Sequence, residues 1–336
     1  MILAGDIGGT NTRLAFFEGT PDRLRPMEIE IFPSAHFAGP AEIVRRFLEI
    51  HKHAVEAACF GLPGAVVNGR VETTNLPWVV DSRHLSAELG LERVQLINDL
   101  YANAQGIALL ADSDLVVLNP GVPNATGNRA LISAGTGLGE AGLFADAQGA
   151  YHPFPSEGGH ADFAPRNDVE MELLRYLLGR FEHVSYERVL SGPGLYNLYQ
   201  FLRDTGRGEE PTWLAEQIAQ GDPPATISKS ALEGTSEICV QALDMFVSLY
   251  GAEAGNLALK MLATGGVYVG GGIAPKIIRK LSSTIFMKSF TAKGRSSGVL
   301  KEIPVRVITN DKTALLGAGR VATQSLAKPQ EAGGAG

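Results

Sequence analysis

Residues 4–15 read AGDIGGTNTRLA, and this stretch decides the fold of the chain. Apolar residues lead into Asp6, and two adjacent glycines then permit a tight turn whose backbone can come close to a ligand. Side chains alternate from Thr12 to Phe17 in the pattern of a second strand. The stretch is therefore predicted to form a strand, a glycine turn and a returning strand.

The turn between these strands has the composition of a phosphate-binding loop. Its backbone N–H groups and polar side chains suit an anion, and they come from Gly8, Gly9, Thr10 and Asn11. No metal is expected to be fixed by the protein alone, but Asp6 suits Mg²⁺ held through water. An ordinary hairpin turn also fits a Gly-Gly pair. The neighbouring polar residues favour the phosphate loop.

Composition limits the partners of the chain. Its 336 residues are 45% hydrophobic and carry 29 Lys+Arg against 36 Asp+Glu, a net charge of −7. This length favours two domains. The acidic balance argues against nucleic acid or an anionic membrane as partner. Neither a signal peptide nor an apolar stretch of about 18 residues is found, which predicts a cytoplasmic protein.

A candidate catalytic carboxylate follows a predicted buried strand. Residues 94–97 have the strand pattern and lead directly into Asn98 and Asp99. Ligands of open α/β sheets collect beyond the carboxyl ends of strands, where a carboxylate can take a proton from a substrate hydroxyl. Either residue also suits the N-cap of the following helix, and the two roles can coexist.

The opening pattern returns in the middle of the chain. A strand is predicted at 130–134, a glycine turn at 135–139 and a returning strand at 140–144. Two such hairpins indicate duplicated domains that each give one phosphate loop to a nucleotide held between them. The Gly-x-Gly-x-x-Gly spacing at 137–142 also fits a dinucleotide fingerprint, but no helix begins at its third glycine. The loop at 119–128, rich in Pro, Gly and Asn, is predicted to cross between the domains.

Three further segments carry polar or glycine-rich patterns. Residues 153–163 lack a hydrophobic period and are predicted to form a loop, which contains an acid, two glycines and a histidine. Glu187 lies shortly before a Ser-Gly-Pro-Gly sequence, and three glycines follow a strand before a helix predicted to start near Pro275. Each pattern has an ordinary alternative: an incidental surface pair, a solvated carboxylate and a plain strand-to-helix connection.

Taken together, in their order and spacing, these motifs resemble the bacterial ATP-dependent glucokinase family. They are DIGGTN at 6–11, IND at 97–99, AGTGLG at 134–139, EGGH at 157–160, ERVLSGPG at 187–194 and GGVYVGGG at 265–272. The resemblance implies an α/β, two-domain actin-like (ribonuclease H-like) fold with the active site in the interdomain cleft. It also implies a homodimer, a small domain at 1–110 onto which a helix at 312–325 packs back, and a large domain at 111–311.

The same resemblance implies an activity and roles for single residues. The γ-phosphoryl group of ATP, bound with Mg²⁺, would pass to the 6-hydroxyl of D-glucose, with Asp99 as the general base. The hydroxyls of glucose would be bound by Asn75, Asn98, Asp99, Glu157, His160 and Glu187. ATP would be bound by Asp6, Gly8, Gly9, Thr10, Asn11, Gly135, Thr136, Gly137, Ser191, Gly192, Gly270, Gly271 and Gly272.

Two other functions fit the same sequence. A non-catalytic sugar sensor would use the same cleft without consuming ATP, and a kinase for mannose or an amino sugar would differ only in its choice of hexose. No cysteine cluster follows the EGGH motif and no helix-turn-helix precedes Asp6. Both absences count against the related zinc-containing sugar kinases and repressors.

Overall fold

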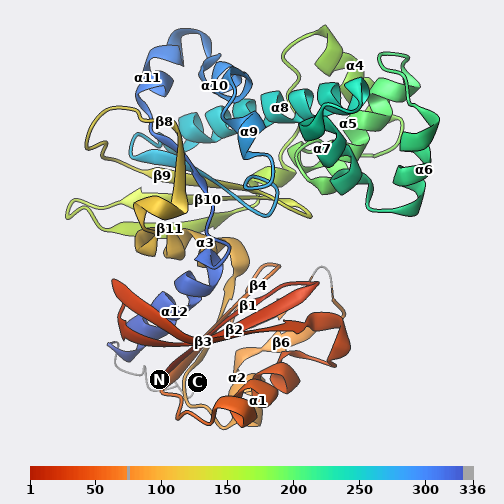
Figure 1. The fold of residues 1–336 in the computed structure, drawn as a ribbon. Helices are drawn as coiled ribbons and strands as arrows, with labels where there is room; N and C mark the ends of the chain where they lie inside the picture. Colours follow the sequence, from red (N-terminus) through yellow and green to blue (C-terminus); the bar gives the residue numbers. More distant parts are fainter. Residues whose placement is uncertain (74–75, 328–336) are drawn as a thin grey trace. The chain divides into compact units, whose positions relative to one another are not determined.

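The computed structural model describes residues 1–73 and 76–327, which form an α/β protein (Figure 1). Contacts divide the chain into two compact units. Unit 1 contains Met1–Ser113 and Asn310–Gly336, and unit 2 contains Asp114–Thr309. The domains expected at 1–110 with 312–325 and at 111–311 stay a prediction.

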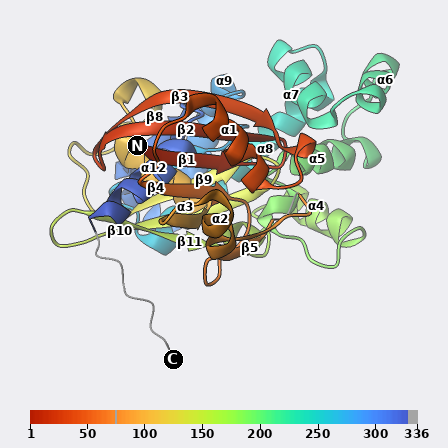
Figure 2. The same ribbon diagram turned by 90° about the horizontal axis from the view of Figure 1, so that it is seen from below.

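Unit 1 is built on a five-stranded mixed sheet. Its strands lie side by side in the order β3 (Arg23–Pro33), β2 (Asn11–Thr20), β1 (Ile2–Ile7), β4 (Ala57–Leu62) and β7 (Val94–Asn98). Figure 2 shows the first four of them in this order. β1 is antiparallel to β2 and parallel to β4, so the predicted opening hairpin is confirmed and β1 lies inside the sheet.

Helices cover both faces of this sheet. One face packs on α1 (Pro40–His51) and α2 (Ser82–Leu89), and the other packs on α12 (Thr313–Leu326). Successive residues of β1 point to opposite faces, so Leu3 joins the first core and Ile2 the second. α3 (Asp99–Gly106) packs on α12. A small pair, β5 (Arg70–Glu72) and β6 (Val79–Asp81), completes the unit.

Unit 2 contains a six-stranded sheet. The strands follow the order β11 (Tyr151–Ser156), β10 (Leu138–Ala145), β9 (Arg129–Ala134), β12 (Gly266–Gly270), β13 (Val305–Ile308) and β8 (Leu115–Asn119). β9 and β10 are antiparallel neighbours, which confirms the second predicted hairpin. The 25-residue helix α8 (Glu237–Met261) packs on β9, and the Tyr250 hydroxyl accepts a hydrogen bond from the N–H of Ala134 at 3.1 Å.

Shorter helices complete unit 2. They are α4 (Asp168–Leu178), α5 (Gly192–Asp204), α6 (Thr212–Gln220), α7 (Pro223–Glu233), α9 (Ile278–Leu281), α10 (Thr284–Thr291) and α11 (Ser297–Glu302). Among the residues that the structure describes, none of the helices is both long and apolar enough to cross a bilayer.

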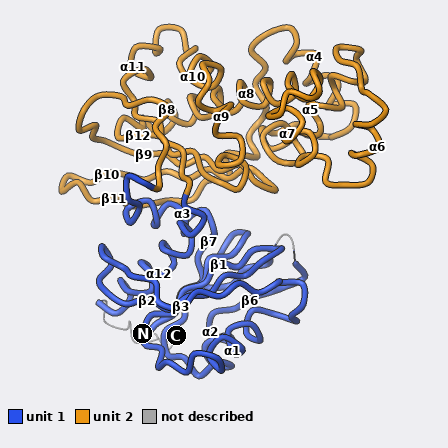
Figure 3. The backbone as a smooth tube through the Cα atoms, viewed as in Figure 1, with its two compact units in different colours: residues 1–113, 310–336 blue, residues 114–309 orange. Residues whose placement is uncertain are grey.

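Three sequence predictions are wrong in detail. The first part of the predicted loop 153–163 is strand β11, which lies at the edge of its sheet and therefore tolerates prolines. The helix expected near Pro275 begins at Ile278, after a series of turns. The loop 119–128 lies inside unit 2 between β8 and β9, because the chain passes between the units at 113/114 (Figure 3).

Candidate active site

A buried serine, Ser34, stabilises the glycine turn of unit 1 from the core side. The Gly8 N–H donates to the carbonyl of Asn11 at 2.9 Å, which closes the turn. The Ser34 hydroxyl donates to the Gly8 carbonyl at 2.7 Å and lies 3.0 Å from the Thr12 hydroxyl. Thr10 and Asn11 are exposed. Hydrogen bonds therefore fix the turn from the core side, and the side chains of Thr10 and Asn11 are accessible to a ligand.

Asp6 lies next to this turn in an acidic environment. Burial and the Asp99 carboxylate raise the pKa of Asp6 to about 6; the Arg13 guanidinium opposes this and Asp311 adds to it. Arg13 is paired with Asp311 at 2.9 Å, N to O. Two carboxylates close enough to raise a pKa in this way attract a cation.

The donor set around Asp6 fits Mg²⁺ held with a nucleotide. Mg²⁺ prefers oxygen ligands and keeps several waters, so one or two carboxylates and substrate phosphates suffice. Within 1–73 and 76–327, no three His, Cys, Asp or Glu side chains are grouped as a metal site. The carboxylates of Asp6 and Asp99 thus suit a hydrated ion and do not form a complete protein cage.

Asp99 and Asn98 stand where β7 ends and α3 begins. Asn98 Oδ1 accepts hydrogen bonds from the N–H groups of Leu100 at 2.9 Å and Tyr101 at 3.1 Å, and is the N-cap. The Asn98 amide donates to the Gly64 carbonyl at 3.1 Å. Of the two candidate N-cap residues, Asn98 is therefore the one that caps the helix. Asp99 occupies the first turn, where the helix dipole favours a carboxylate. Asn75, the remaining predicted residue of this half, lies outside the described residues.

In unit 2 the structure brings together three predicted sugar-binding side chains. His160 lies between two acids, with Nε2 3.9 Å from Glu157 Oε2 and Nδ1 3.9 Å from Glu187 Oε1. His160 lies in the short helix Gly158–His160, and Glu157 is the N-cap of that helix. Glu187 lies in another short helix, Tyr186–Arg188. Segments far apart in sequence thus build one polar cluster, called here the acid–histidine cluster.

The acid–histidine cluster is joined to the second glycine turn. Glu187 Oε2 accepts a hydrogen bond from the N–H of Leu138 at 2.9 Å. A Cβ at Gly137 would lie 2.5 Å from the same oxygen, so a side chain at this position would displace the carboxylate. The turn that was predicted to bind phosphate and an acid that was predicted to bind sugar are therefore direct neighbours.

The three glycine-rich segments of unit 2 meet at the carboxyl end of β9. The Gly192 N–H donates to the Gly135 carbonyl at 2.8 Å, and the Ile273 N–H donates to the Ala134 carbonyl at 3.2 Å. Gly271 has φ +83° and a Cβ there would lie 2.2 Å from the Ala134 carbonyl oxygen, so this position requires glycine. The Ser191 hydroxyl caps α5 by accepting from the Gly194 N–H at 3.0 Å.

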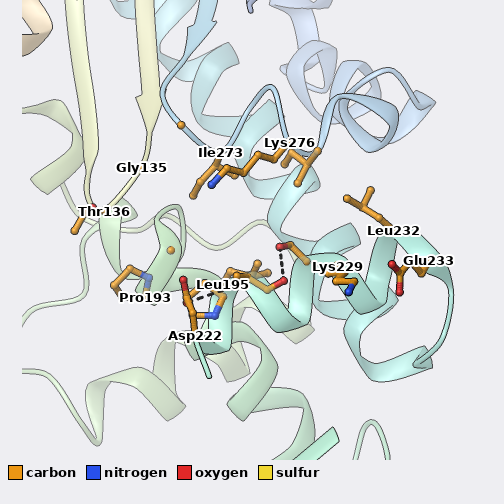
Figure 4. Close-up of a pocket in the computed structure, with 16 residues that line it drawn as sticks. Gly135, Thr136, Pro193, Leu195, Asp222, Lys229, Leu232, Glu233, Ile273 and Lys276 are labelled. Atoms are coloured by element: carbon orange, nitrogen blue, oxygen red, sulfur yellow. Dashed lines mark hydrogen bonds between the residues drawn. The ribbon is translucent and has the colours of Figure 1, made fainter. Parts of the chain in front are cut away.

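A cavity of about 1090 Å³ opens beside these segments. It is bounded by Gly135, Thr136, Gly192 and Gly272 of the predicted set. In Figure 4, Ile273 and Lys276 line its upper side, with Pro193, Leu195 and Asp222 below. Its volume exceeds the range of typical small-molecule sites, about 300–1,000 Å³. The cavity thus has room for a nucleoside.

Sequence reasoning missed several residues of this cavity. Among them are Leu195, Asp222, Lys229, Glu233 and Lys276. Asp222 caps α7 and the others lie on amphipathic helices or in turns, where such residues are usual. Asp222, Lys229 and Glu233 are distinguished only by the proximity of α7 to the glycine segments, and the sequence carries no signal of it.

Comparison with known proteins gives consistent matches. The sequence model of the family described as Glucokinase matches residues 3–325. A glucokinase of Nostoc sp. is 42% identical over 341 aligned residues, which cover 96% of this chain and 99% of the relative. The crystal structure of a glucokinase from an Antarctic psychrotroph superposes with TM-score 0.83 at 32% identity, over 96% of this chain and 98% of that one.

A more distant structure matches in fold. It is a ROK family glucokinase from Streptomyces griseus in complex with glucose and AMPPNP, with TM-score 0.66 and 21% identity over 96% of this chain and 99% of that one. The structural matches confirm the predicted fold class, the two-domain actin-like α/β fold.

Proposed function

Since this chain belongs to the glucokinase family and phosphorylates glucose with ATP, we propose a role for each part of the candidate site. Asp99 is the general base, the acid–histidine cluster binds the sugar, and the glycine turns bind ATP. The observation that carries this proposal is the gathering of Glu157, His160 and Glu187 beside the glycine turn at 135–137.

Asp99 has the chemistry that phosphoryl transfer requires of the protein. The reaction needs an oriented nucleophile and neutralised phosphate charge, and little covalent help. A carboxylate within hydrogen-bonding reach of the 6-hydroxyl orients it and accepts its proton as the bond to phosphorus forms. Its position after a parallel strand of the unit 1 sheet supports this role.

The acid–histidine cluster suits a polyhydroxylated substrate. Two carboxylates accept hydrogen bonds from sugar hydroxyls, and the imidazole of His160 donates or accepts one. We propose that Asn75 and Asn98 bind further hydroxyls. A sugar that lacks or inverts one hydroxyl leaves a polar group unpaired and is rejected.

ATP binding is divided among several segments. We propose that the turn of Gly8, Gly9, Thr10 and Asn11 and the turn at 135–137 contact the phosphates through backbone N–H groups. The cavity beside Gly192 and the glycines 270–272 takes the adenosine. Mg²⁺ near Asp6, held through water, would neutralise phosphate charge.

We also propose a cytoplasmic homodimer without nucleic acid or membrane partners. Family resemblance supports the dimer, and the net charge of −7 supports the absence of anionic partners. Light scattering coupled to size exclusion tests the dimer, because a single species of 35.6 kDa would contradict it.

The decisive experiment is a coupled assay for glucose 6-phosphate with the purified protein. ATP consumption that depends on glucose is expected, whereas a sensor would bind glucose by calorimetry and produce no glucose 6-phosphate. Comparing kcat/KM for glucose, mannose and glucosamine in the same assay identifies the preferred hexose. A higher value for mannose or glucosamine would contradict the assignment of glucose.

A further inference from the structure

Unit 2 contains a pair of buried acids that the proposed roles do not use. Glu140 lies on β10 with 1% of its surface exposed, and Glu253 lies on α8 with 0% exposed. Glu140 Oε1 finds no N–H or O–H donor among the described residues. The two acids interact closely enough for a side-chain hydrogen bond, which requires that one of them carry a proton.

Glu140 contacts the segment that carries part of the acid–histidine cluster. A Cβ at Gly158 would lie 2.0 Å from Glu140 Oε2, so the carboxyl group occupies the space where another residue's side chain would begin. Gly158 is the residue between Glu157 and the Gly159-His160 pair. The backbone of this short helix therefore packs directly against the Glu140 carboxyl group.

Glu253 connects the pair to the other cluster segment. The Asn256 amide nitrogen donates to Glu253 Oε2 at 2.7 Å and to the Tyr186 hydroxyl at 3.0 Å. Tyr186 precedes Glu187 in the same short helix. Lys260 Nζ lies 3.2 Å from Glu253 Oε1. One buried polar network thus supports both segments from which the acid–histidine cluster is built.

We propose that Glu140 is a positioning residue for glucose: packed against Gly158 and paired with Glu253, its carboxyl group holds the segment Glu157–His160 in its binding geometry. This inference rests on the proposed role of the acid–histidine cluster in binding glucose. Glu140 does not touch the sugar and acts through the backbone of Gly158.

Protonation of the pair follows from its surroundings. Burial and the Glu253 carboxylate raise the pKa of Glu140 to about 8, while the Lys260 ammonium opposes the rise. The pair therefore holds one proton near neutral pH, in the hydrogen bond between the two carboxyl groups. The other titratable groups that face the pair and its network are Tyr186, Tyr250, Arg166, Glu170 and Lys293.

Loss of this proton places two negative charges in a buried space. Because like charges in such a place repel strongly, the Glu140 carboxylate is expected to move and to disturb Gly158. Glucose binding should then weaken as the pH rises through about 8. ATP binding, which does not involve the segment 157–160, should not follow.

The first test compares two substitutions of Glu140. Glu140→Gln keeps the shape and a donor for Glu253 but cannot ionise, so its KM for glucose should match wild type near neutral pH and stay flat above it. Wild type should show a rising KM over the same range. Glu140→Ala removes the support and should raise the KM for glucose about tenfold at every pH, with the KM for ATP unchanged.

The second test approaches the contact from the other side. Gly158→Ala introduces a Cβ where Glu140 Oε2 lies and should raise the KM for glucose. Combined with Glu140→Ala, which removes the obstruction, it should add no further loss. Gly298→Ala is the matched control, because a Cβ there meets nothing within 4 Å.

The outcomes separate this inference from the proposed function. If wild type makes no glucose 6-phosphate, the proposed function fails. If wild type is active and Glu140→Gln shows the same rise in KM at high pH, or Glu140→Ala keeps the wild-type KM, the positioning role is wrong. Equal losses in the KM for glucose and for ATP would indicate general damage to unit 2 and would also overturn it.

Discussion

The carboxylate of Glu187 accepts a hydrogen bond from the backbone N–H of Leu138 at 2.9 Å, while its second oxygen lies 3.9 Å from His160 Nδ1. Leu138 begins β10 directly after the glycine turn. One side chain therefore belongs to the acid–histidine cluster and also fixes the turn proposed to bind phosphate. Glucose and ATP affinities should be linked through it.

Replacement of Glu187 should accordingly affect both substrates. Glu187→Ala removes a charged hydrogen-bond acceptor, worth about 1.5–3 kcal/mol, so the KM for glucose should rise about 10- to 100-fold. The KM for ATP should rise as well because the Leu138 N–H loses its partner. Glu157→Ala is the control, since Glu157 has no contact with the turn in the described hydrogen bonds and should affect glucose alone. Steady-state kinetics with each substrate varied in turn distinguishes the two variants. If Glu187→Ala and Glu157→Ala have the same KM for ATP, the link between glucose and ATP affinity through Glu187 is wrong.

Asp99→Asn should abolish turnover while binding persists. The amide cannot accept the proton of the 6-hydroxyl, so kcat should fall by about 10²- to 10⁴-fold. Calorimetry should show glucose and ATP affinities close to wild type. Asp112→Asn, an exposed carboxylate of the same unit, should leave kcat unchanged. A kcat near wild type for Asp99→Asn would refute the base assignment.

Ser34→Ala should loosen the first glycine turn. The hydroxyl is fully buried and bonded to the Gly8 carbonyl, and its removal also leaves the buried Thr12 hydroxyl without that partner. The free energy of unfolding should fall by about 1–3 kcal/mol, and the KM for ATP should rise. Denaturant titration and kinetics measure the two effects. Ser113→Ala, at an exposed position, should change neither.

The pH dependence of stability should report on Asp6. Its pKa is raised from 3.8 to about 6, so the folded protein keeps a proton that the unfolded chain has already released. The contribution of Asp6 to the free energy of unfolding should therefore fall as the pH rises from about 4 to about 6 and stay level above. Asp6→Asn cannot titrate, so the wild-type value minus the variant value should fall by about 3 kcal/mol across this range. Urea unfolding of both proteins without nucleotide or Mg²⁺ measures this difference. If the free energies of unfolding of wild type and Asp6→Asn change in parallel with pH, the prediction is wrong.

The two lysines of the unit 2 cavity should matter for ATP alone. Lys229→Met and Lys276→Met remove positive charge from a cavity proposed to take adenosine, and each should raise the KM for ATP on the order of tenfold. The KM for glucose should not change. Lys288→Met, at an exposed position of α10, is the control. An unchanged ATP KM in both cavity variants would show that neither lysine contacts the bound nucleotide.

Sequence patterns predicted the elements whose signals are local. The apolar periodicity of residues 40–51 predicts a helix, and α1 forms over this range because Pro40 suits the first helical position and Lys52 adopts the left-handed conformation after its end. α2 is bounded in the same way, by the Asp81 cap and by Gly90 at φ 65°. Both glycine hairpins are also local and were predicted correctly.

Features that depend on distant partners could not be predicted. Pro153 and Pro155 argue against a strand, yet they pair with Leu143 and Ala141 because β11 is an edge strand. In the sequence Glu140 looks like any polar residue of a strand, because its partner Glu253 lies on the distant helix α8. The residues of α7 that line the cavity were missed for the same reason. The roles of the predicted site residues stay predictions until kinetics tests them.

The path of the chain through unit 1 has a consequence for its synthesis. Leu315, Ala318 and Ala322 of α12 complete one of the two cores of this unit, against Ile2 and Ala4 of the first strand. The ribosome synthesises these strands long before the helix that covers them, so the apolar face of that sheet stays uncovered until residues 313–326 have also been synthesised. Unit 2, which is continuous, can fold in the interval. Asp6 and Asp99, which share unit 1 with α12, should therefore reach their final arrangement only after unit 2 has been synthesised.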